Sequence, residues 1–404
     1  IVNLWQSISD ENDLLNLINI VSVEIFGQTE EKSQFYTLKQ LHFHAHSNDN
    51  EKLYITFRIP KKKRGEFRTI DAPNSTLKGI QQCLNYIFQQ IYTPNKYAVG
   101  FVPNRSIIDG AKVHTSQKFV YNIDLKDFFP SISSGRLYKR LQSKPFCLNP
   151  QIASLVSDLC CYKNAENKSV LPQGAPTSPT ITNFICERLD RKLCKLAVAY
   201  GLKYTRYADD ITFSGMKNIF AENGKFCKSL RNIIENEEHL IINKDKSRLC
   251  HIGMRQEVTG LTVNEKVNVS RKYVKQLRTM IHNWETNGYE EAQSKFIKLY
   301  KPTKQLSSNP RIENVIGGKL DFLKMVKGES DANYKNLNER FKILSICRKI
   351  ANESENTNET AIDVPEIQVA DNQNDKSLNT NTANNHIKEK LNLLFESKFD
   401  LSIL

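Results

Sequence analysis

Two adjacent acidic residues, Asp209 and Asp210, stand in the middle of the chain, where a short strand is expected to turn back on itself. They belong to the string KYTRYADDITFSG (residues 203–215), whose β-branched and aromatic residues on both sides of the pair predict a tight β-hairpin. Two like charges at such a turn repel each other, and burying either one without a partner costs several kcal/mol. A divalent cation would remove that cost, so the pair is a candidate metal site.

A third acidic residue, Asp124, lies in the string YNIDLKDFF (residues 121–129), which predicts a strand that runs into a turn. If this strand lies beside the hairpin, Asp124 faces Asp209, and together the carboxylates offer the oxygen ligands that Mg²⁺ prefers. Two such ions, about 3.5 to 4 Å apart, can activate an attacking hydroxyl and stabilise a departing pyrophosphate. We therefore predict that Asp124, Asp209 and Asp210 are catalytic and bind Mg²⁺, with Mn²⁺ as a substitute. An ordinary solvated turn is the alternative.

The charge of the chain favours a polyanionic partner. The 404 residues carry a formal net charge of +13, but residues 351–404 hold ten acidic residues against four lysines, a net of −6. Residues 1–350 therefore carry +19, because 13 + 6 = 19. A surface of this kind attracts nucleic acid more readily than acidic small molecules.

The elements that must position these residues follow from hydrophobic periodicity and capping signals. We expect, in chain order, an opening helix over 10–26, a strand pair over 53–73, a helix capped by Asn74 or Ser75, a long helix that begins after Pro179, a helix near 222–236, another strand pair near 248–269, and a helix from Ser270 with an apolar stripe of Val274, Leu277, Ile281 and Trp284.

Three strings of the chain resemble the motifs of reverse transcriptases, and they stand in the order of that family. YADD (207–210) resembles the catalytic hairpin of the palm, NIDLKDFFPSI (122–132) its upstream metal-binding strand, and LPQGAPTSPTITN (171–183) the Gln-Gly loop with its helix. The resemblance implies an RNA-directed DNA polymerase with a right-hand α+β fold: fingers, a palm of antiparallel sheet plus helices, and a helical thumb. It also implies Mg²⁺ as cofactor and dNTPs as substrates.

The family resemblance extends to the residues that would meet the triphosphate of the incoming nucleotide. FRIPKKKRGEFRTIDAP (57–73) resembles the fingers motif, in which Arg68, with Lys63 nearby, would bind the phosphates. For the basic run of residues 61–64, a solvated charge run is the alternative.

The same resemblance places three further residues beside the nucleotide. Gln173 and Gly174 would form part of the dNTP site, and Phe129 falls where the family has a bulky side chain against the 2′ position of the sugar. Ordinary core packing is the alternative for Phe129 and its neighbour Phe128.

The string RQEVTGLTVNEKVNVSRKYVKQLR (255–278) resembles the Val-Thr-Gly block and thumb helix of bacterial retron reverse transcriptases. A basic helix beside a strand pair can lie against the shallow minor groove of an A-like duplex. The resemblance implies that the template RNA is contacted by His114, Val258, Thr259, Gly260, Arg271, Lys275 and Arg278. A turn that needs Gly260 for its positive φ is the alternative for the block.

One string departs from the retron pattern. Retron enzymes commonly show Asn-Ala-x-x-His before the first palm strand, whereas IIDGAKVH (107–114) has Gly110 in place of Asn and keeps Ala111 and His114. Another bacterial defence reverse transcriptase or a group II intron-like enzyme therefore stays open. The alternative of another class is a non-catalytic nucleic-acid binding protein, against which the three acidic residues argue.

The retron resemblance also implies a biological role. Such an enzyme copies part of a cognate structured noncoding RNA from a guanosine 2′-hydroxyl. The product is a branched RNA–DNA hybrid, multicopy single-stranded DNA, that helps to defend a bacterium against phage together with an effector protein. The oligomeric state stays open.

The sequence also suggests a division into segments and a compartment. No run of 18 apolar residues and no secretion signal is visible, so we expect a bacterial cytoplasmic protein without a membrane partner. The expected segments are an N-terminal helical segment (1–29), fingers and palm (30–264), a thumb or RNA-binding region (265–350), an acidic, Asn-rich disordered linker (351–385) and a short amphipathic helix (386–404).

Cysteine and histidine patterns do not indicate a structural metal site. The nine cysteines include no CxxC pair, so we expect reduced thiols. His42, His44 and His46 would share one face of a strand, but no fourth ligand lies nearby in the sequence, and we expect no metal there.

Overall fold

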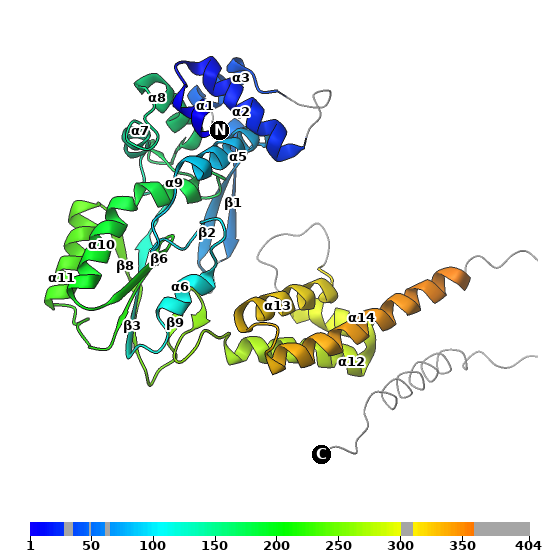
Figure 1. Cartoon of the computed structure of the whole chain (residues 1–404). Helices are drawn as coiled ribbons and strands as arrows, with labels where there is room; N and C mark the ends of the chain where they lie inside the picture. The colour runs from blue at the N-terminus through cyan, green and yellow to red at the C-terminus, as the bar shows by residue number, and fades with distance from the viewer. Residues whose placement is uncertain (28–34, 48–49, 61–64, 300–309, 359–404) are drawn as a thin grey trace, which may run out of the picture. The chain divides into compact units, whose positions relative to one another are not determined.

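A four-stranded antiparallel sheet with helices on both sides forms the centre of the chain (Figure 1). The structure is a computed structural model that describes residues 1–27, 35–47, 50–60, 65–299 and 310–358. The helices are α1 (Val2–Gln6), α2 (Glu11–Phe26), α3 (Leu38–His46), α4 (Asn50–Leu53), α5 (Ser75–Ile91), α6 (Ile107–Val113), α7 (Ser134–Leu141), α8 (Pro150–Cys160), α9 (Ser178–Ile185), α10 (Glu187–Ala199), α11 (Lys225–Arg231), the π-helix η1 (Asn232–Glu237), α12 (Arg271–Leu299), α13 (Ile312–Lys327) and α14 (Ala332–Asn358). The strands are β1 (Tyr54–Pro60), β2 (Phe67–Pro73), β3 (Phe119–Lys126), β4 (Tyr162–Lys163), β5 (Ser169–Val170), β6 (Lys203–Tyr207), β7 (Asp210–Gly215), β8 (Ile241–His251), β9 (Glu257–Val258) and β10 (Leu261–Thr262).

The central sheet has the strand order β6-β7-β3-β8, and every neighbouring pair is antiparallel. Because side chains alternate along a strand, β3 turns Ile123 toward α10 and α11 and turns Asp124 to the opposite face. Ile123 and Phe213 are 0% exposed and share a core with Leu189 of α10 and Phe226 of α11. The α+β prediction is therefore confirmed, and the acidic residues lie on the face that α10 and α11 leave open.

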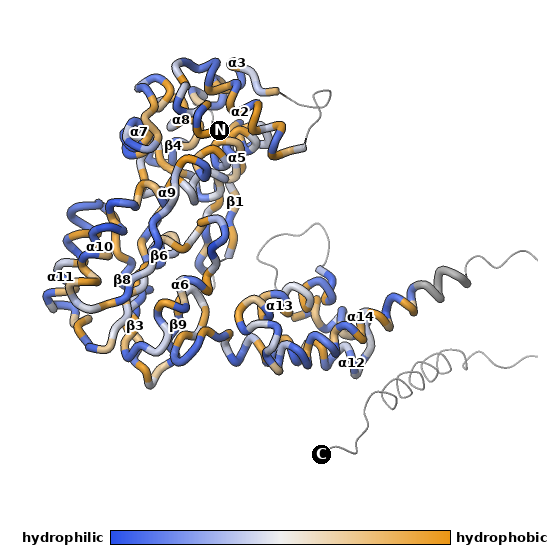
Figure 2. Tube along the Cα trace, in the orientation of Figure 1, coloured by the Kyte–Doolittle hydropathy of each residue, from blue (hydrophilic) through white to orange (hydrophobic). Residues whose placement is uncertain are grey.

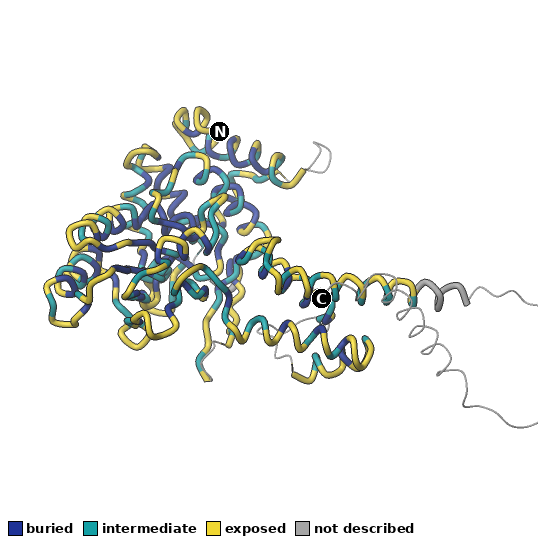
Figure 3. The backbone as a smooth tube through the Cα atoms, turned by 60° about the horizontal axis from the view of Figure 1, so that its bottom comes forward, coloured by how far each residue is buried: buried dark blue, intermediate teal, exposed yellow. Residues whose placement is uncertain are grey.

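The fingers have their own apolar core, built by α1, α2, α5 and α8. The Asn74 side chain caps α5 and accepts a hydrogen bond from the Leu77 amide at 2.9 Å, as one of the two predicted caps. The opening helix and the strand pair over 53–73 are also confirmed, as α2 and as β1 with β2. Buried residues concentrate in this part of the chain and around the central sheet (Figure 3).

The long helix expected after Pro179 is two helices. Residue Ser178 begins α9, and Cys186, with φ −82° and ψ 6°, separates it from α10. Proline is accepted in the first turn of a helix, where its missing N–H has no intrahelical partner. Beyond the break, α10 directs Asp190 into the core of the palm, where it pairs with Arg206. The helix near 222–236 likewise ends in the π-helical turn η1.

The thumb begins with α12, whose apolar stripe is confirmed. Leu277, Ile281 and Trp284 are buried against α13, while most of the residues between them are exposed, so hydropathy alternates along the helix (Figure 2). Gly288, with φ 77° and ψ 171°, interrupts the helical backbone.

The chain divides into two units, Ile1–Arg348 and Lys349–Leu404. Helix α14 extends to Asn358, so the first eight residues of the linker expected over 351–385 are helical. Extending a helix is far cheaper than nucleating one, which explains why a polar segment continues it. The remainder of that linker and the helix expected over 386–404 lie outside the described residues. Within the described ranges, no helix is long and apolar enough to span a bilayer.

Candidate active site

The predicted hairpin is present, and its turn consists of Ala208 and Asp209. Strand β6 ends at Tyr207 and β7 begins at Asp210, and these two residues are direct partners in the ladder. Ala208 has a φ of 54°, a left-handed conformation that costs a residue with a side chain roughly 1–2 kcal/mol. Such a conformation persists only where the surrounding structure holds it.

Asp124 lies directly opposite Asp210 in the ladder between β3 and β7. Our expectation that it would face Asp209 is therefore corrected, because Asp209 occupies the turn beyond the last ladder pair. The Leu125 amide nevertheless donates to the Asp209 carbonyl oxygen at 3.1 Å, which ties the turn to the end of β3. The sheet thus brings the three predicted acidic residues to one edge, by which we mean the edge formed where β3 ends and β7 begins.

The electrostatics of this edge favour a cation. Burial, followed by the charges of Asp209 and Asp124, raises the pKa of Asp210 to about 7. The pKa of Asp209 is also raised, first by burial and then by Asp124, while Lys246 and Arg68 oppose the shift. Two carboxyl groups whose pKa values are raised, beside the charge of Asp124, are an oxygen donor set suited to Mg²⁺.

The carboxylates do not yet converge as ligands. In the described part of the chain, no group of three or more His, Cys, Asp or Glu side chains is placed to hold a metal ion. Asp124 is bonded to two other side chains, since its Oδ2 accepts from Lys246 Nζ at 3.1 Å and from Asn243 Nδ2 at 3.0 Å. A lysine ammonium therefore supplies positive charge beside the acidic residues.

Lys246 reaches Asp124 because β8 contains a large bulge. Asn243 pairs with Asp124 and Arg248 with Asn122, so the four residues 244–247 lie opposite the single residue Ile123. We had expected only a strand pair near 248–269, and Asn243 and Lys246 were missed. A basic and amide-rich string, INKDKSR, directly before that segment was the available signal.

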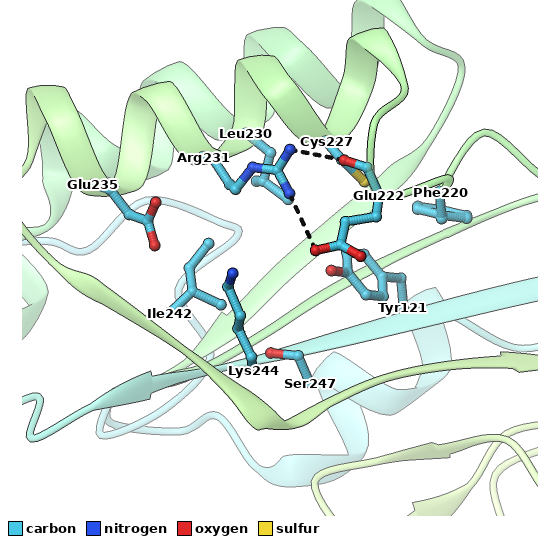
Figure 4. Close-up of a pocket in the computed structure, with 10 residues that line it drawn as sticks. All are labelled: Tyr121, Phe220, Glu222, Cys227, Leu230, Arg231, Glu235, Ile242, Lys244 and Ser247. Atoms are coloured by element: carbon cyan, nitrogen blue, oxygen red, sulfur yellow. Dashed lines mark hydrogen bonds and ion pairs between the residues drawn. The ribbon is translucent and has the colours of Figure 1, made fainter.

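Behind the bulge, on the helix-covered side of the sheet, lies a cavity of about 240 Å³ (Figure 4). Lys244 and Ser247 of the bulge line it from one side, and Arg231 of α11 lines it from the other. Arg231 is tied to Glu222 through the Glu222 carbonyl oxygen, at 2.8 Å from its Nη2. The bulge thus separates this cavity from the acidic residues.

The predicted nucleotide-binding residues come from two segments that touch. Gln173 accepts a hydrogen bond from the Asp71 amide of β2 at 3.0 Å through its carbonyl oxygen. Gly174 has a φ of 148°, and a Cβ there would lie 2.6 Å from the Asp71 carbonyl oxygen, so the contact requires glycine. Arg68, three residues away on β2, is exposed, and its charge lowers the pKa of Asp209. Lys63 lies outside the described residues.

Phe128 and Phe129 have different environments. Phe128 is 3% exposed and belongs to the core of the palm, so the packing alternative applies to it. Phe129 is partly buried at the edge of the fingers core, and the two ring centroids are 5.8 Å apart. Phe129 remains the candidate for contact with the sugar.

The prediction that His114 contacts the template is wrong. His114 is 0% exposed, and its two ring nitrogens lie 2.6 Å from Ser214 Oγ and 2.7 Å from Thr205 Oγ1. Burial lowers the pKa of His114 to about 3, so the ring is neutral and joins the end of α6 to the palm sheet. Close packing also accounts for Gly110, which stands where the retron pattern has Asn. A Cβ at this position would lie 2.9 Å from Val99 Cγ2.

The Val-Thr-Gly block forms the turn between β9 and β10. Thr259 and Gly260 have φ values of 48° and 85°, so the turn alternative is confirmed, and Gly260 is exposed. Val258 is 1% exposed in the thumb core, which contradicts a contact with RNA. A valine suits the buried side of a short strand, and this explains the error.

The cations predicted to bind RNA lie on the outer surface of α12. Arg271, Lys275 and Arg278 are all exposed, and Arg278 donates to Asn333 Oδ1 at 3.3 Å. Their positions are compatible with the predicted contact to a nucleic-acid backbone.

The histidines of HFHAH do not lie on a strand. They belong to helix α3, where His42 stacks on His46 with ring centroids 5.6 Å apart and His44 is buried. Residues at i and i+4 are neighbours on the surface of a helix, and this explains the stacking of His42 on His46 better than the alternation of a strand does.

Comparison with known proteins adds an independent finding. Residues 59–300, more than half of the chain, match the family described as reverse transcriptase (RNA-dependent DNA polymerase). The chain is 36% identical over 234 residues to the retron Ec86 reverse transcriptase of Escherichia coli, covering 57% of this chain and 69% of that protein. It is 34% identical over 261 residues to the retron Mx65 reverse transcriptase of Myxococcus xanthus, covering 61% and 58%.

Among solved structures, the chain is similar to telomerase from Candida albicans in complex with a fragment of telomeric RNA. The TM-score is 0.40 at 13% identity, and the match covers 77% of this chain and 66% of that chain.

Proposed function

The chain belongs to the reverse transcriptase (RNA-dependent DNA polymerase) family and is of the retron type, and on this basis we propose that it copies part of a cognate structured noncoding RNA into single-stranded DNA. Synthesis starts from a guanosine 2′-hydroxyl of that RNA and leaves an RNA–DNA hybrid. The hybrid acts with an effector protein in defence against phage. The resemblance of the Val-Thr-Gly block and thumb helix to retron enzymes supports this assignment.

The single observation that carries the polymerase chemistry is the meeting of Asp124, Asp209 and Asp210 at one sheet edge. Mg²⁺, or Mn²⁺ in its place, would neutralise phosphate charge there and lower the pKa of the primer hydroxyl. The three carboxylates would hold it, and Asp124 must first leave Lys246, which now lies 3.1 Å away. The pKa of Asp210, raised to about 7 without a cation, fits such an exchange.

The incoming dNTP would bind where β2 meets the loop that precedes α9. Arg68 offers an exposed guanidinium for the triphosphate, and its charge already influences Asp209. Gln173 and Gly174 would line the same site because their backbone packs on Asp71 of β2. Phe129 would limit the space at the sugar 2′ position. Catalysis in this arrangement is positioning together with charge neutralisation.

The RNA would lie along the thumb, where Arg271, Lys275 and Arg278 are exposed. Contacts from such side chains to phosphates supply affinity without sequence information. Thr259 and Gly260 lie at the adjacent turn and would approach the same duplex.

In the first assay, the gene is expressed together with its neighbouring DNA and the protein is purified. The nucleic acid that copurifies with the protein is then analysed. We expect an RNA–DNA hybrid in which ribonuclease digestion leaves the DNA joined by a 2′–5′ bond to a short RNA remnant that contains one branched guanosine. A second assay measures dNTP incorporation on a primed RNA template with Mg²⁺ or Mn²⁺. Incorporation without a copurifying hybrid would support another bacterial reverse transcriptase, and bound RNA without any incorporation would support a non-catalytic binding protein.

A further inference from the structure

The turn that carries Asp209 is held from behind by a fully buried guanidinium. Arg206 Nη1 donates to the carbonyl oxygen of Ala208 at 3.2 Å, and the Arg206 side chain is 0% exposed. That carbonyl belongs to the peptide that joins Ala208 to Asp209. A hydrogen bond to it fixes the orientation of the peptide from which the Asp209 side chain departs.

The guanidinium cannot rotate, because Asp190 of α10 holds it at two points. Arg206 Nε lies 2.6 Å from Asp190 Oδ1 and Arg206 Nη2 lies 2.7 Å from Asp190 Oδ2, a bidentate pair with fixed geometry. Tyr204 and Asn95 also donate to the Asp190 carboxylate, at 2.7 and 3.1 Å. Every oxygen of the buried carboxylate is thus satisfied, and Nη1 of Arg206 remains directed at the turn.

Asn183 connects this pair to the opposite side of the turn. Its Oδ1 accepts from Arg206 Nη2 at 3.3 Å, and its Nδ2 donates to the Gly100 carbonyl oxygen at 2.9 Å. A Cβ at Gly100 would lie 2.9 Å from the Ala208 amide nitrogen, so this segment packs directly on the turn. One asparagine therefore fixes both the guanidinium and the backbone that covers Ala208.

Stability alone does not explain a buried charge pair here. Replacing a buried ion pair by neutral residues of similar volume is often without cost, because desolvation offsets the attraction. The pair does explain how a left-handed alanine is kept in place directly before Asp209. The geometry, and not the charge as such, is what neutral residues could not reproduce.

We propose that Arg206 is a positioning residue for the polymerase reaction: its hydrogen bond to Ala208 fixes the direction in which the Asp209 carboxylate meets the divalent cation. The inference rests on the proposed function of Asp209 as a cation ligand. Arg206 acts through the turn, since its full burial keeps it from the substrate.

The test compares Arg206→Met combined with Asp190→Asn against a matched control. Both substituted side chains are neutral, so the double variant leaves no buried charge uncompensated, but it lacks the side-chain donor to the Ala208 carbonyl oxygen. The control, Arg136→Met combined with Glu238→Gln, removes another ion pair, 2.9 Å long, whose acid is 4% exposed. Glu238 also pairs with Lys192 at 2.7 Å and with Arg188 at 3.1 Å, so the control disturbs a buried carboxylate at least as strongly, at a place away from the turn. Melting temperature and primer–template affinity are measured for both.

For the Arg206 pair we expect single-nucleotide incorporation to fall about 100-fold at limiting Mg²⁺, the size expected for a misplaced catalytic group. The loss should shrink as Mg²⁺ is raised, while primer–template affinity stays within about twofold. Mn²⁺ binding to the free protein is measured by electron paramagnetic resonance, and the relevant signal is the one that Asp209→Asn removes. In the Arg206 double variant this binding should weaken about tenfold. The control should keep the wild-type rate and Mn²⁺ affinity.

Wild-type Mn²⁺ affinity and rate in a folded Arg206 variant would overturn the inference, and so would an equal loss in the control. If the double variant does not fold, Arg206→Lys serves instead, since one ammonium cannot reach both Asp190 oxygens and the Ala208 carbonyl. Absence of DNA synthesis by the wild-type protein would instead contradict the proposed function, while the Mn²⁺ titration would still decide whether Arg206 orients Asp209.

Discussion

The palm and the thumb carry their charges in opposite ways. Around the hairpin of the palm, charged side chains are bonded to one another: Asp190 and Arg206 are 0% exposed, and Asp124 accepts from Asn243 and Lys246. In the thumb, Arg271 and Lys275 are exposed, and neither side chain is paired with an acidic residue in the part of the chain that the structure describes.

The interiors of the palm and the thumb also differ in polarity. The thumb core consists of apolar side chains such as Leu277, Ile281 and Ile316, whereas the palm sheet buries polar residues such as His114 and Thr205. Buried charges have effects that depend on exact geometry, because the low dielectric strengthens their electrostatic interactions and hydrogen bonds fix their positions. Exposed charges act through a field that salt screens. Substitutions should therefore have large, local effects in the palm and modest, salt-dependent effects in the thumb.

The largest effect is expected at Asp209. Asp209→Asn keeps the volume of the side chain but removes a charge that would bind the cation, so DNA synthesis should fall at least about 1,000-fold while folding and RNA binding persist. The measurement is dNTP incorporation on a primed RNA template with Mg²⁺ or Mn²⁺. Activity within tenfold of wild type would contradict the assignment of Asp209 to the cation.

A smaller effect is expected when Thr259, Arg271, Lys275 and Arg278 are all changed to Ala. Initiation on the cognate RNA should suffer more than extension of an arbitrary primer. The salt dependence of binding should flatten by about 0.7 to 0.9 in slope for each RNA phosphate that the variant no longer neutralises. Initiation and extension are measured across a salt series.

The matched control for the thumb variant is Lys195, Lys225 and Lys228 changed to Ala, which removes three exposed cations from α10 and α11. It should leave initiation unchanged. Equal losses on both templates would make the thumb a general electrostatic clamp without selectivity for one RNA.

Phe129 tests whether a partly buried ring at the edge of the fingers core has a local role. Phe129→Ala should relax discrimination against ribonucleotides by roughly tenfold, the scale of a steric change in a pocket, because the 2′-hydroxyl would no longer meet the ring. Incorporation of rNTPs and dNTPs is compared with that of Phe128→Leu, which alters only the core. An unchanged ratio would assign sugar selection to another residue.

The smallest effect on catalysis is expected at His114, where only stability should respond. Its folded pKa is about 3 and its unfolded value near 6.5, so the unfolded chain gains the proton first and stability is lost as pH falls below 6.5. Between pH 6.5 and 5 the loss is about 1.6 kcal/mol relative to His114→Gln. Urea unfolding of both proteins at the two pH values measures it, and parallel curves would contradict the buried neutral ring.

Local sequence patterns sufficed for the hairpin, the cap at Asn74 and the apolar stripe of α12, because each depends on neighbours in the chain. The acidic residues were predictable for the same reason. His114 was not, because its partners Thr205 and Ser214 lie 91 and 100 residues away. The register of β8 and the pairing of Arg206 with Asp190 depend likewise on which strand and helix become neighbours, and no local pattern records that.

The bulge in β8 has a consequence for anyone who engineers this protein. Four residues opposite Ile123 leave part of the ladder unformed, and a shortened, regular strand would be the obvious route to a higher melting temperature. That shortening would also remove Lys246 from Asp124. Stabilising substitutions therefore belong on surfaces such as α10 and α11, because a regular β8 would change the contacts of Asp124, a carboxylate that the proposed function assigns to the cation.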